Sequence, residues 1–488
     1  MVLEPRSLAT KLTVQDVGYR EAPAWPTRQR RTYNAPVAEH LLIIGGVAAG
    51  LSAASRARKC ASGLRITVLE KGPVAAYGAC GLPFFLAGQV AKPEDLIVHS
   101  PDYFQTQRGI TVLTQHEALA IVPGRRQVIT QTPAGEATLS YDRLVVATGA
   151  QARLHLPGDD LKGVFESNTW GGALRLDAAL REGKPGRVAV IGAGYIGLEV
   201  AAALRQRGLE VLLLDRGTML LNGLDGDVSA SIAPLLARHD VLVFPSSEAV
   251  ELLPGTRNEV VAVRMRQGTT RADLVVNCGG LRPNVALAKE AGIALGVTGA
   301  IAVDERQQTN LPGVYAAGDC AETTELVSGR PTWVPLGTAA NKQGRVAGQN
   351  AGGGMVARFP GVLGTLAVRL FDFEVGRTGL STEQAQRAGF NPVSERIEAP
   401  IQAGYLTSGE SPRLTVKIIY DRQTERLLGC QMLGPAGSVA GRLDAAAVAL
   451  TARLTLEQIE MLDLAYSPPL APLYEPLLIA AHRARGRA

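Results

Sequence analysis

The chain has 488 residues, of which 19% are charged and 46% are hydrophobic, a balance typical of folded proteins and not of disordered ones. This length predicts about three domains, each large enough to bury a core. The 50 basic and 45 acidic residues give a net charge of +5, and no run of like charges resembles a nucleic-acid-binding arm, so we expect no nucleic-acid partner.

Residues 1–39 are expected to form a flexible N-terminal extension. They carry scattered basic residues but lack the apolar stretch of a secretory signal. No apolar run in the chain reaches the roughly 18 residues that a membrane-spanning helix needs. The five cysteines are scattered and show neither C-x-x-C nor metal-ligand spacing, which argues against a disulfide framework and a metal site. We therefore expect a cytoplasmic protein without a membrane segment.

A first βαβ unit begins near residue 40. A buried strand over 41–44 is followed by a glycine turn, a helix rich in small residues and a second strand over 65–70. The turn departs from the dinucleotide-binding fingerprint, because Val47 stands where the middle glycine usually lies. Glu70, 20 residues after Gly50, is nevertheless well placed to bind a ribose hydroxyl.

Cys80 follows this first unit, so we expect it at the carboxyl edge of the sheet, where ligands bind in such folds. Nearby glycines and an expected helix start indicate that amide dipoles lower the pKa of its thiol. The other cysteines are interpreted as structural. Because no second cysteine lies close in sequence, a disulfide at Cys80 must form with a small thiol, or the sulfur must cycle as a sulfenic acid.

A second βαβ unit is predicted from a strand over 187–191 to a strand over 211–215, and it carries a complete fingerprint. Gly192 permits the tight turn, Gly194 lets the backbone approach a diphosphate, and Gly197 lets the helix pack on the strand. Asp215 is placed to bind a ribose 2′-hydroxyl, which favours NADH. The adjacent Arg216 is suited to a 2′-phosphate, so NADPH remains open.

Two dinucleotide-binding units imply two dinucleotides, and a bound flavin that accepts hydride from a nicotinamide is the simplest combination. Asp319 follows a further strand and glycine turn, where its carboxylate is suited to the ribityl chain of a flavin. After residues 352–354 the pattern changes. Alternation over 414–419 predicts an antiparallel sheet, helical patterns cover 438–464, and the tail is rich in proline, which together indicate a separate C-terminal domain.

Together these segments resemble the pyridine nucleotide–disulfide oxidoreductase superfamily over residues 40–482. The single cysteine and the tail at 463–474 resemble its single-cysteine branch, and coenzyme A disulfide reductase most of all. The strings that carry this resemblance are Gly45-Gly46-Val47-Ala48-Ala49-Gly50, Ala79-Cys80-Gly81-Leu82-Pro83, Thr309-Asn310-Leu311-Pro312-Gly313-Val314-Tyr315-Ala316-Ala317-Gly318-Asp319, Asn341-Lys342-Gln343-Gly344-Arg345 and the tail itself.

The resemblance implies an α/β fold with two tandem Rossmann-like domains, for FAD and NAD(P), and a C-terminal α+β dimerisation domain. The implied limits are 40–155 and 284–357 for the two parts of the FAD-binding domain, 156–283 for the NAD(P)-binding domain and 358–488 for the dimerisation domain. A homodimer is implied, in which the tail reaches the neighbouring active site.

The resemblance also implies a set of binding residues. For FAD these are Gly45, Gly46, Val47, Ala48, Ala49, Gly50, Glu70, Lys71, Ala118, Thr148, Gly149, Ala150, Gly318, Asp319 and Ala339. For NAD(P) they are Gly192, Gly194, Tyr195, Ile196, Gly197, Asp215, Arg216 and Gly280, with Tyr195 as a gate at the flavin. For the substrate they are Ser52, Arg56, Lys59, Arg108 and Asn341. Ser52, Arg56 and Lys59 share one helix face, and its cations suit the phosphates of coenzyme A.

By this resemblance the chain reduces a small disulfide, most simply coenzyme A disulfide, through a mixed disulfide at Cys80. Tyr466 and Tyr474 match tail positions where a phenol can give a proton to the leaving thiolate. NADH oxidases of the branch resemble one another in having a histidine at the position that Ala48 occupies here. The alternative of an NADH oxidase therefore lacks a residue that those enzymes share. Polysulfide or persulfide reduction uses the same cysteine. An electron-transfer reductase for a ferredoxin-type protein is the alternative of another class.

Overall fold

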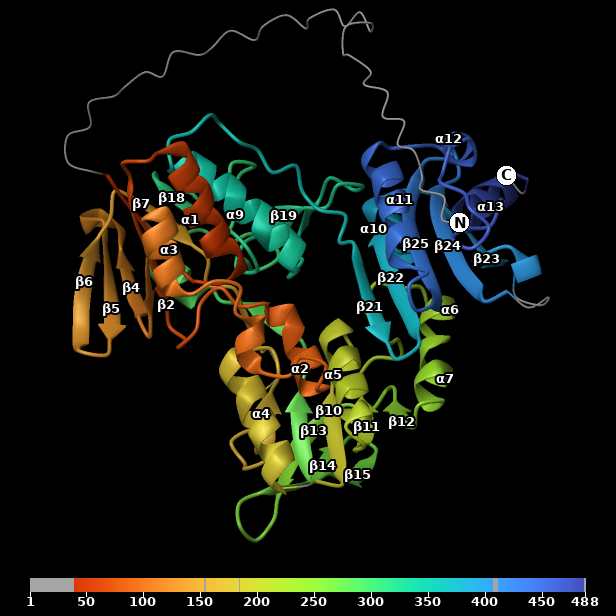
Figure 1. Cartoon of the computed structure of the whole chain (residues 1–488), viewed down its shortest axis with the longest axis horizontal. Coiled ribbons are helices and arrows are strands. Elements are labelled where there is room, and N and C mark those ends of the chain that lie inside the picture. The colour runs from red at the N-terminus through yellow and green to blue at the C-terminus, as the bar shows by residue number, and fades with distance from the viewer. Residues whose placement is uncertain (1–38, 153–154, 184, 407–410, 487–488) are drawn as a thin grey trace, which may run out of the picture. The chain divides into compact units, whose positions relative to one another are not determined.

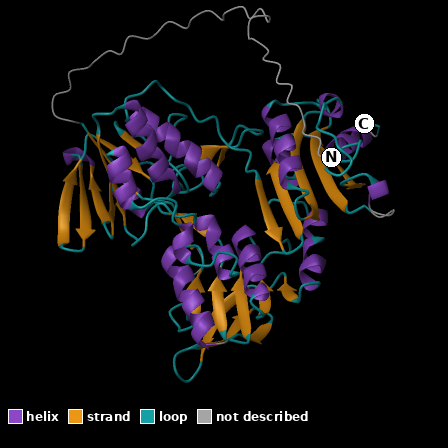
Figure 2. Cartoon of the chain, in the orientation of Figure 1, coloured by secondary structure: helices purple, strands orange, loops and turns teal. Residues whose placement is uncertain are grey.

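The computed structural model describes residues 39–152, 155–183, 185–406 and 411–486. The predicted N-terminal extension, residues 1–39, lies outside the described residues except for its last position. Figure 2 shows the strands gathered into separate sheets with helices packed against them. Within the described ranges, no helix combines the length and the apolar character needed to cross a membrane.

The first sheet is parallel, with the strand order β18-β7-β1-β2-β3 (Figure 1). Its strands are β1 (His40–Ile44), β2 (Arg65–Glu70), β3 (Thr111–Thr114), β7 (Arg143–Val146) and β18 (Val314–Ala316). The helices beside it are α1 (Ala48–Cys60), α3 (Pro101–Arg108) and α9 (Gly337–Ala351). Because β7 and β18 come from distant parts of the chain, residues near 147–150 and 317–319 meet the first glycine turn at one edge of this sheet.

The second sheet is also parallel, with the order β12-β11-β10-β16-β9. Its strands are β9 (Val164–Glu166), β10 (Arg187–Ile191), β11 (Glu210–Leu214), β12 (Val241–Phe244) and β16 (Leu274–Asn277). The helices of this part are α2 (Leu82–Leu86), α4 (Trp170–Gly183), α5 (Tyr195–Gln206), α6 (Gly226–Ser229) and α7 (Ile232–Ala237). The predicted βαβ unit is confirmed as β10, α5 and β11.

Each parallel sheet is accompanied by a three-stranded antiparallel sheet that the sequence did not predict. The first contains β4 (Glu117–Val122), β5 (Gln127–Thr132) and β6 (Gly135–Ser140), and the second contains β13 (Ala249–Pro254), β14 (Val260–Met265) and β15 (Gly268–Arg271). The remaining short elements are β8 (Ala150–Ala152), β17 (Leu281–Pro283), α8 (Ala286–Glu290), β19 (Thr323–Thr324) and β20 (Pro331–Thr332).

The C-terminal sheet is antiparallel, as predicted, with the order β21-β22-β25-β24-β23. Its strands are β21 (Leu366–Leu370), β22 (Phe373–Gly379), β23 (Pro392–Pro400), β24 (Arg413–Asp421) and β25 (Leu427–Pro435). Its helices are α10 (Thr382–Ala388), α11 (Ala440–Thr451), α12 (Leu456–Glu460) and α13 (Pro476–Arg485). The sheets do not by themselves fix where each domain ends, so the predicted domain limits stay predictions.

β24 is buried along nearly its whole length, although its sequence alternates. The helices α11 and α13 cover one side of this sheet, and the segment leading into α6 packs on it from the nucleotide-binding part. Lys417 of β24 is buried there, with Nζ 2.8 Å from Asp225 Oδ2 and 2.7 Å from Asp227 Oδ1. The polar positions of the strand therefore serve contacts between two parts of the chain.

Candidate active site

The two glycine turns correspond at their first and last glycines. Gly45 and Gly192 begin them with φ values of 110° and 103°, a conformation that favours glycine. A Cβ on Gly50 would lie 1.8 Å from the carbonyl oxygen of Gly45, and one on Gly197 would lie 1.8 Å from that of Gly192. The first and last glycines of each turn are therefore required for the helix to pack against its strand.

Glu70 at the end of β2 and Asp215 directly after β11 occupy matching positions in the two units. The Glu70 carboxylate accepts hydrogen bonds from the amides of Gly46 at 2.8 Å and Gly72 at 2.7 Å. The Asp215 carboxylate accepts from Ala193 at 2.6 Å and Gly217 at 2.7 Å. Each acid thus holds its glycine turn in place, and each carboxylate keeps lone pairs for a further donor. Their binding of ribose hydroxyl groups stays a prediction.

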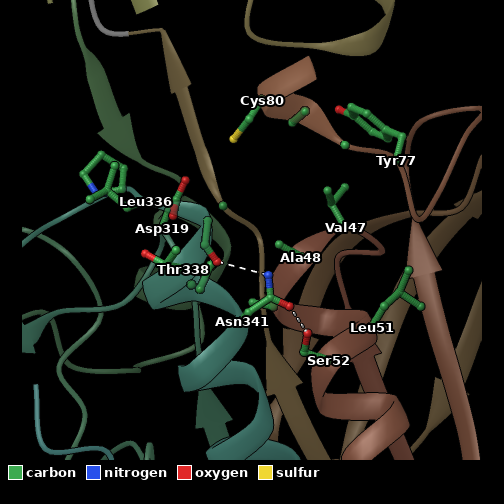
Figure 3. A pocket seen from close by; sticks show the side chains of 18 of the residues that line it. Val47, Ala48, Leu51, Ser52, Tyr77, Cys80, Asp319, Leu336, Thr338 and Asn341 are labelled. Carbon is green, nitrogen blue, oxygen red and sulfur yellow. Dashed lines mark hydrogen bonds between the residues drawn. The ribbon is translucent and has the colours of Figure 1, made fainter. Parts of the chain in front are cut away.

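A cavity of about 940 Å³ lies where the first sheet, α5, α9 and the start of α2 meet. Predicted flavin, cysteine and substrate residues line it together, some of them shown in Figure 3. They are Val47, Ala48, Ala49, Ser52, Arg56, Lys59, Cys80, Arg108, Gly149, Ala150, Tyr195, Ile196, Gly318, Asp319 and Asn341. Segments far apart in the sequence therefore form one concave site of the size of a cofactor pocket.

Cys80 lies in a 3₁₀ turn, Ala79–Gly81, before the short helix α2, and its side chain is accessible in the cavity. Burial raises the pKa of its thiol, and the carboxylates of Glu199 and Asp319 raise it further. The predicted lowering of this pKa is therefore wrong. A turn of three residues aligns too few amides to offset two nearby carboxylates.

A different helix end approaches the sulfur. A Cβ built on Gly337 would lie 3.9 Å from Cys80 Sγ, and Gly337 is the first residue of the 15-residue helix α9. The positive end of a helix dipole favours a thiolate over a thiol. Sequence reasoning missed this contact, because Gly337 carries no recognisable motif.

Asp319 lines the cavity with a carboxylate that makes no hydrogen bond or ion pair with the described residues. Burial raises its pKa to about 6. Its backbone carbonyl accepts a hydrogen bond of 2.7 Å from Trp333 Nε1, which fixes the segment. A buried acceptor with no protein donor is suited to a ligand hydroxyl group, so the residues present fit the ribityl chain of a flavin.

Glu199 is a site residue that the sequence analysis did not identify. It lines the large cavity from α5, one helical turn after Tyr195, and burial raises its pKa to about 7. The available signal was a single carboxylate on the otherwise apolar helix segment Tyr195–Leu204. A carboxyl group of this kind can hold or release a proton near neutral pH.

Tyr195 lines both the large cavity and a second cavity of about 220 Å³. Its hydroxyl donates a hydrogen bond of 2.9 Å to the carbonyl of Pro335, and burial raises its pKa, so the phenol keeps its proton. Predicted NAD(P) residues line the smaller cavity with it, namely Gly194, Ile196, Gly197 and Gly280. A phenol between two cavities can open or close the path from one to the other.

The predicted substrate residues cluster along α1 and its neighbours. Ser52 Oγ donates to Asn341 Oδ1 at 2.5 Å, and Arg56 Nε donates to Gln349 Oε1 at 2.8 Å, so both pairs join α1 to α9. Arg108 Cζ lies 5.6 Å from the ring centroid of Tyr103, in the range of a cation–π contact. Three cations, Arg56, Lys59 and Arg108, therefore line one part of the large cavity.

Several predicted site residues line neither cavity. The glycine turns behind the cavities are formed by Gly45, Gly46, Gly50 and Gly192 and are held by the acids Glu70 and Asp215. The hydroxyl group of Thr148 donates a hydrogen bond of 2.7 Å to the carbonyl of Asn284. Lys71, Ala118, Arg216 and Ala339 also lie outside the linings. Tyr466 and Tyr474 are 49% and 72% exposed, so within one chain they do not reach the cysteine cavity.

Comparisons with known proteins agree with this arrangement. The family model described as pyridine nucleotide-disulphide oxidoreductase matches residues 39–344, and the model for the dimerisation domain of such proteins matches residues 366–475. Among solved structures, a NAD-dependent persulfide reductase from A. fulgidus has a TM-score of 0.88 and 35% identity, covering 92% of this chain and 83% of that one.

Three curated relatives differ in their named activities. The chain is 36% identical to a CoA-dependent NAD(P)H sulfur oxidoreductase of Pyrococcus abyssi, covering 91% of this chain and 98% of the relative. It is 34% identical to an NADH oxidase of Methanocaldococcus jannaschii, with coverage of 91% and 98%. It is 26% identical to a coenzyme A disulfide reductase of Staphylococcus haemolyticus, with coverage of 91% and 99%.

Proposed function

Because the chain belongs to the pyridine nucleotide-disulphide oxidoreductase family, whose cofactors are FAD and NAD(P)H, we propose that it reduces a sulfur–sulfur bond in a small molecule through Cys80. The observation that carries this proposal is the shared cavity. One space is lined by Cys80, by the unpaired carboxylate of Asp319, by the gate residue Tyr195 and by the basic residues of α1.

We assign the cofactors to the two glycine turns. The amides of the β1–α1 turn and of the N-terminus of α1 would hold the diphosphate of FAD, and Asp319 would accept a hydrogen bond from its ribityl chain. The β10–α5 turn presents its amides to NAD(P)H. Bound FAD supplies the two electrons, taken from NAD(P)H, that return Cys80 from a mixed disulfide to the thiol. Tyr195 shields the path between the cavities from water until the nicotinamide enters.

The sulfur chemistry belongs to Cys80. Its thiolate attacks one sulfur atom of the substrate, the sulfur–sulfur bond breaks, and the departing sulfur leaves as a thiolate that takes up a proton. Because the thiol has a raised pKa, a nearby base must accept its proton. We propose Glu199, whose pKa of about 7 allows its carboxylate to do so near neutral pH. The α9 N-terminus beside Gly337 then favours the thiolate.

The relatives change which substrate stands first. The resemblance in sequence motifs favours coenzyme A disulfide, yet the relative named for coenzyme A disulfide is 26% identical, and the relatives named for sulfur and persulfide are 36% and 35% identical. We therefore propose a persulfide or polysulfide as the substrate. Coenzyme A disulfide is the second candidate, favoured by Arg56, Lys59 and Arg108, whose charges suit its phosphates.

We also propose that two copies of the chain form the working enzyme. The family match over residues 366–475 is to a dimerisation domain. Four apolar side chains of this region are largely exposed, Val448, Met461, Leu470 and Leu473. Large apolar side chains that a domain leaves exposed are candidates for burial in an interface.

The test compares sulfur substrates in anaerobic holoenzyme. We expect NAD(P)H oxidation with polysulfide to release sulfide faster than NAD(P)H oxidation with coenzyme A disulfide releases the free thiol, and C80S to abolish both. Mass spectrometry should find a sulfur adduct on Cys80 that NAD(P)H removes. The exposed Cys60 provides the control, since C60S should keep wild-type rates. Full turnover in C80S, or oxygen as the only efficient acceptor, would contradict the proposal.

A further inference from the structure

Arg377 is a cation of the C-terminal sheet that lines the nucleotide-side cavity. It lies in β22 and lines the cavity of about 220 Å³ together with Gly194 and Gly197 of the second glycine turn. We propose that Arg377 binds the diphosphate of the nicotinamide nucleotide. This inference rests on the proposed use of NAD(P)H and adds a binding residue from outside the nucleotide-binding domain.

The guanidinium of Arg377 has no counterion among the residues that the structure describes. Its Nε is shielded from solvent and has no hydrogen-bond partner, and within the described ranges no carboxylate offsets the burial that lowers its pKa. Arginine stays charged in proteins under these conditions, and a buried charge without a partner is costly. An anionic ligand bound beside Arg377 would offset this cost.

Two glycines, which have no Cβ, make room for the side chain of Arg377. A Cβ on Gly223 would lie 2.7 Å from Cζ and Nε of Arg377, and one on Gly364 would lie 3.5 Å from its Nη1. Gly223 has a φ of 91°, so its backbone is itself in a conformation that favours glycine. The loop after β11 therefore lies directly against the guanidinium, which confines it beside the cavity.

The charge of the cavity suits a diphosphate. Among the described residues that line it, Arg377 is the only charged one, and the others are apolar or neutral, such as Ser167, Asn168 and Asn222. The 12-residue helix α5 begins at this wall and adds the positive end of its dipole. A diphosphate brings two negative charges and several oxygens, which a guanidinium can bind in a bidentate manner.

The experiment separates diphosphate binding from a structural role. The flavin of the holoenzyme is reduced anaerobically by NADH or by 1-benzyl-1,4-dihydronicotinamide, which carries the same reactive ring without phosphates. In R377M we expect the rate constant with NADH at low concentration to fall about 10- to 100-fold, as for loss of a charge-assisted hydrogen bond. The rate constant with the benzyl compound should stay at the wild-type value. R377K should recover part of the NADH rate.

A binding measurement and a charge control complete the design. Calorimetry with ADP-ribose, which has the diphosphate but no nicotinamide, should show a similar loss of affinity in R377M. R369M removes an exposed arginine from β21 of the same sheet and should change neither quantity. Equal loss with both reductants would mean a structural role, and unchanged ADP-ribose affinity would exclude the contact. A wild-type flavin that neither NADH nor NADPH reduces would overturn the proposed function and this inference together.

Discussion

Cys80 must lose a proton to react, and its surroundings in the cavity oppose that loss. Burial is the largest cause of the raised pKa, and the carboxylates of Glu199 and Asp319 add to it. Burial also raises the pKa of these two carboxyl groups, to about 7 for Glu199 and to about 6 for Asp319. The charge state of each carboxyl group therefore affects the pKa of the Cys80 thiol.

From this coupling we expect E199Q to lower the pKa of Cys80. The neutral amide removes the negative charge that disfavours the thiolate wherever Glu199 is ionised, so more thiolate is present between the pKa of Glu199, about 7, and the pKa of the thiol. The measurement is the rate of Cys80 alkylation by iodoacetamide from pH 6 to 10 in the holoenzyme, followed by mass spectrometry. The inflection should move to lower pH, and alkylation at pH 7 should become a few times faster.

Cys60 in the same samples provides the control, because it is exposed and lies outside the cavity lining. Its alkylation rate should not differ between the wild type and E199Q. An inflection for Cys80 that stays in place, or moves to higher pH, would show that Glu199 does not act on the sulfur.

The position of Cys80 could be predicted from the sequence, but its electrostatics could not. A cysteine just after a βαβ unit lies at the carboxyl edge of the sheet, because strand order fixes where that edge is. The direction of its pKa shift depends first on burial and then on the carboxylates of Glu199 and Asp319, all of which are set by distant parts of the chain. Glu70 and Asp215 show the same division, since their places were predicted but their bonds to the turn amides were not.

At the scale of elements, the cavity depends on the close packing of α1 against α9. A Cβ on Gly344 would lie 2.2 Å from the carbonyl oxygen of Ala49, and one on Gly348 would lie 2.1 Å from that of Ala53. Glycines four residues apart thus let the two helix backbones touch. The hydrogen bond between Ser52 and Asn341 spans the same contact, so its length depends on this distance.

We expect G348A to destabilise the protein by about 2 kcal/mol, because the added methyl group must push the two backbones apart. Thermal unfolding of the holoenzyme should show a lower Tm and earlier release of flavin. G441A is the matched control. Gly441 lies in the exposed first turn of α11, where a Cβ would meet nothing within 4 Å, so this change should leave the Tm unchanged or slightly higher. A wild-type Tm in G348A would mean that the helices separate at no cost.

The elements that were predicted are those with local signals. The parallel units could be recognised because a buried strand, a glycine turn and a helix follow one another in the sequence, and residues 45–50 and 192–197 are built alike. The antiparallel sheets β4–β6 and β13–β15 were missed. Their strands are mostly half-exposed, so their sequences carry little periodic apolar signal.

At the scale of the whole molecule, the position of the tail within one chain differs from the role predicted for it. Tyr466 is 49% exposed and lines neither cavity, although it matches a position predicted to give a proton near Cys80. We propose that in the homodimer the tail of one copy reaches the cysteine of the other, an arrangement with which both facts would agree. A phenol in that place would donate a proton to the departing thiolate.

Mixed dimers test this arrangement directly. C80S and Y466F homodimers should each lose most of their turnover, Y466F by roughly 100-fold or more, as expected for loss of a general acid. When the two variants are unfolded and refolded together in equal amounts, about half of the dimers pair unlike chains. In each such dimer the intact Cys80 of one chain meets the intact Tyr466 of its partner at one of two sites, so about a quarter of wild-type turnover should return.

Refolding C80S with C80A should restore nothing. Turnover in the first mixture that stays at the mean of the two variants would place Tyr466 outside the partner's site, because no other arrangement of two defective chains can rebuild a complete one.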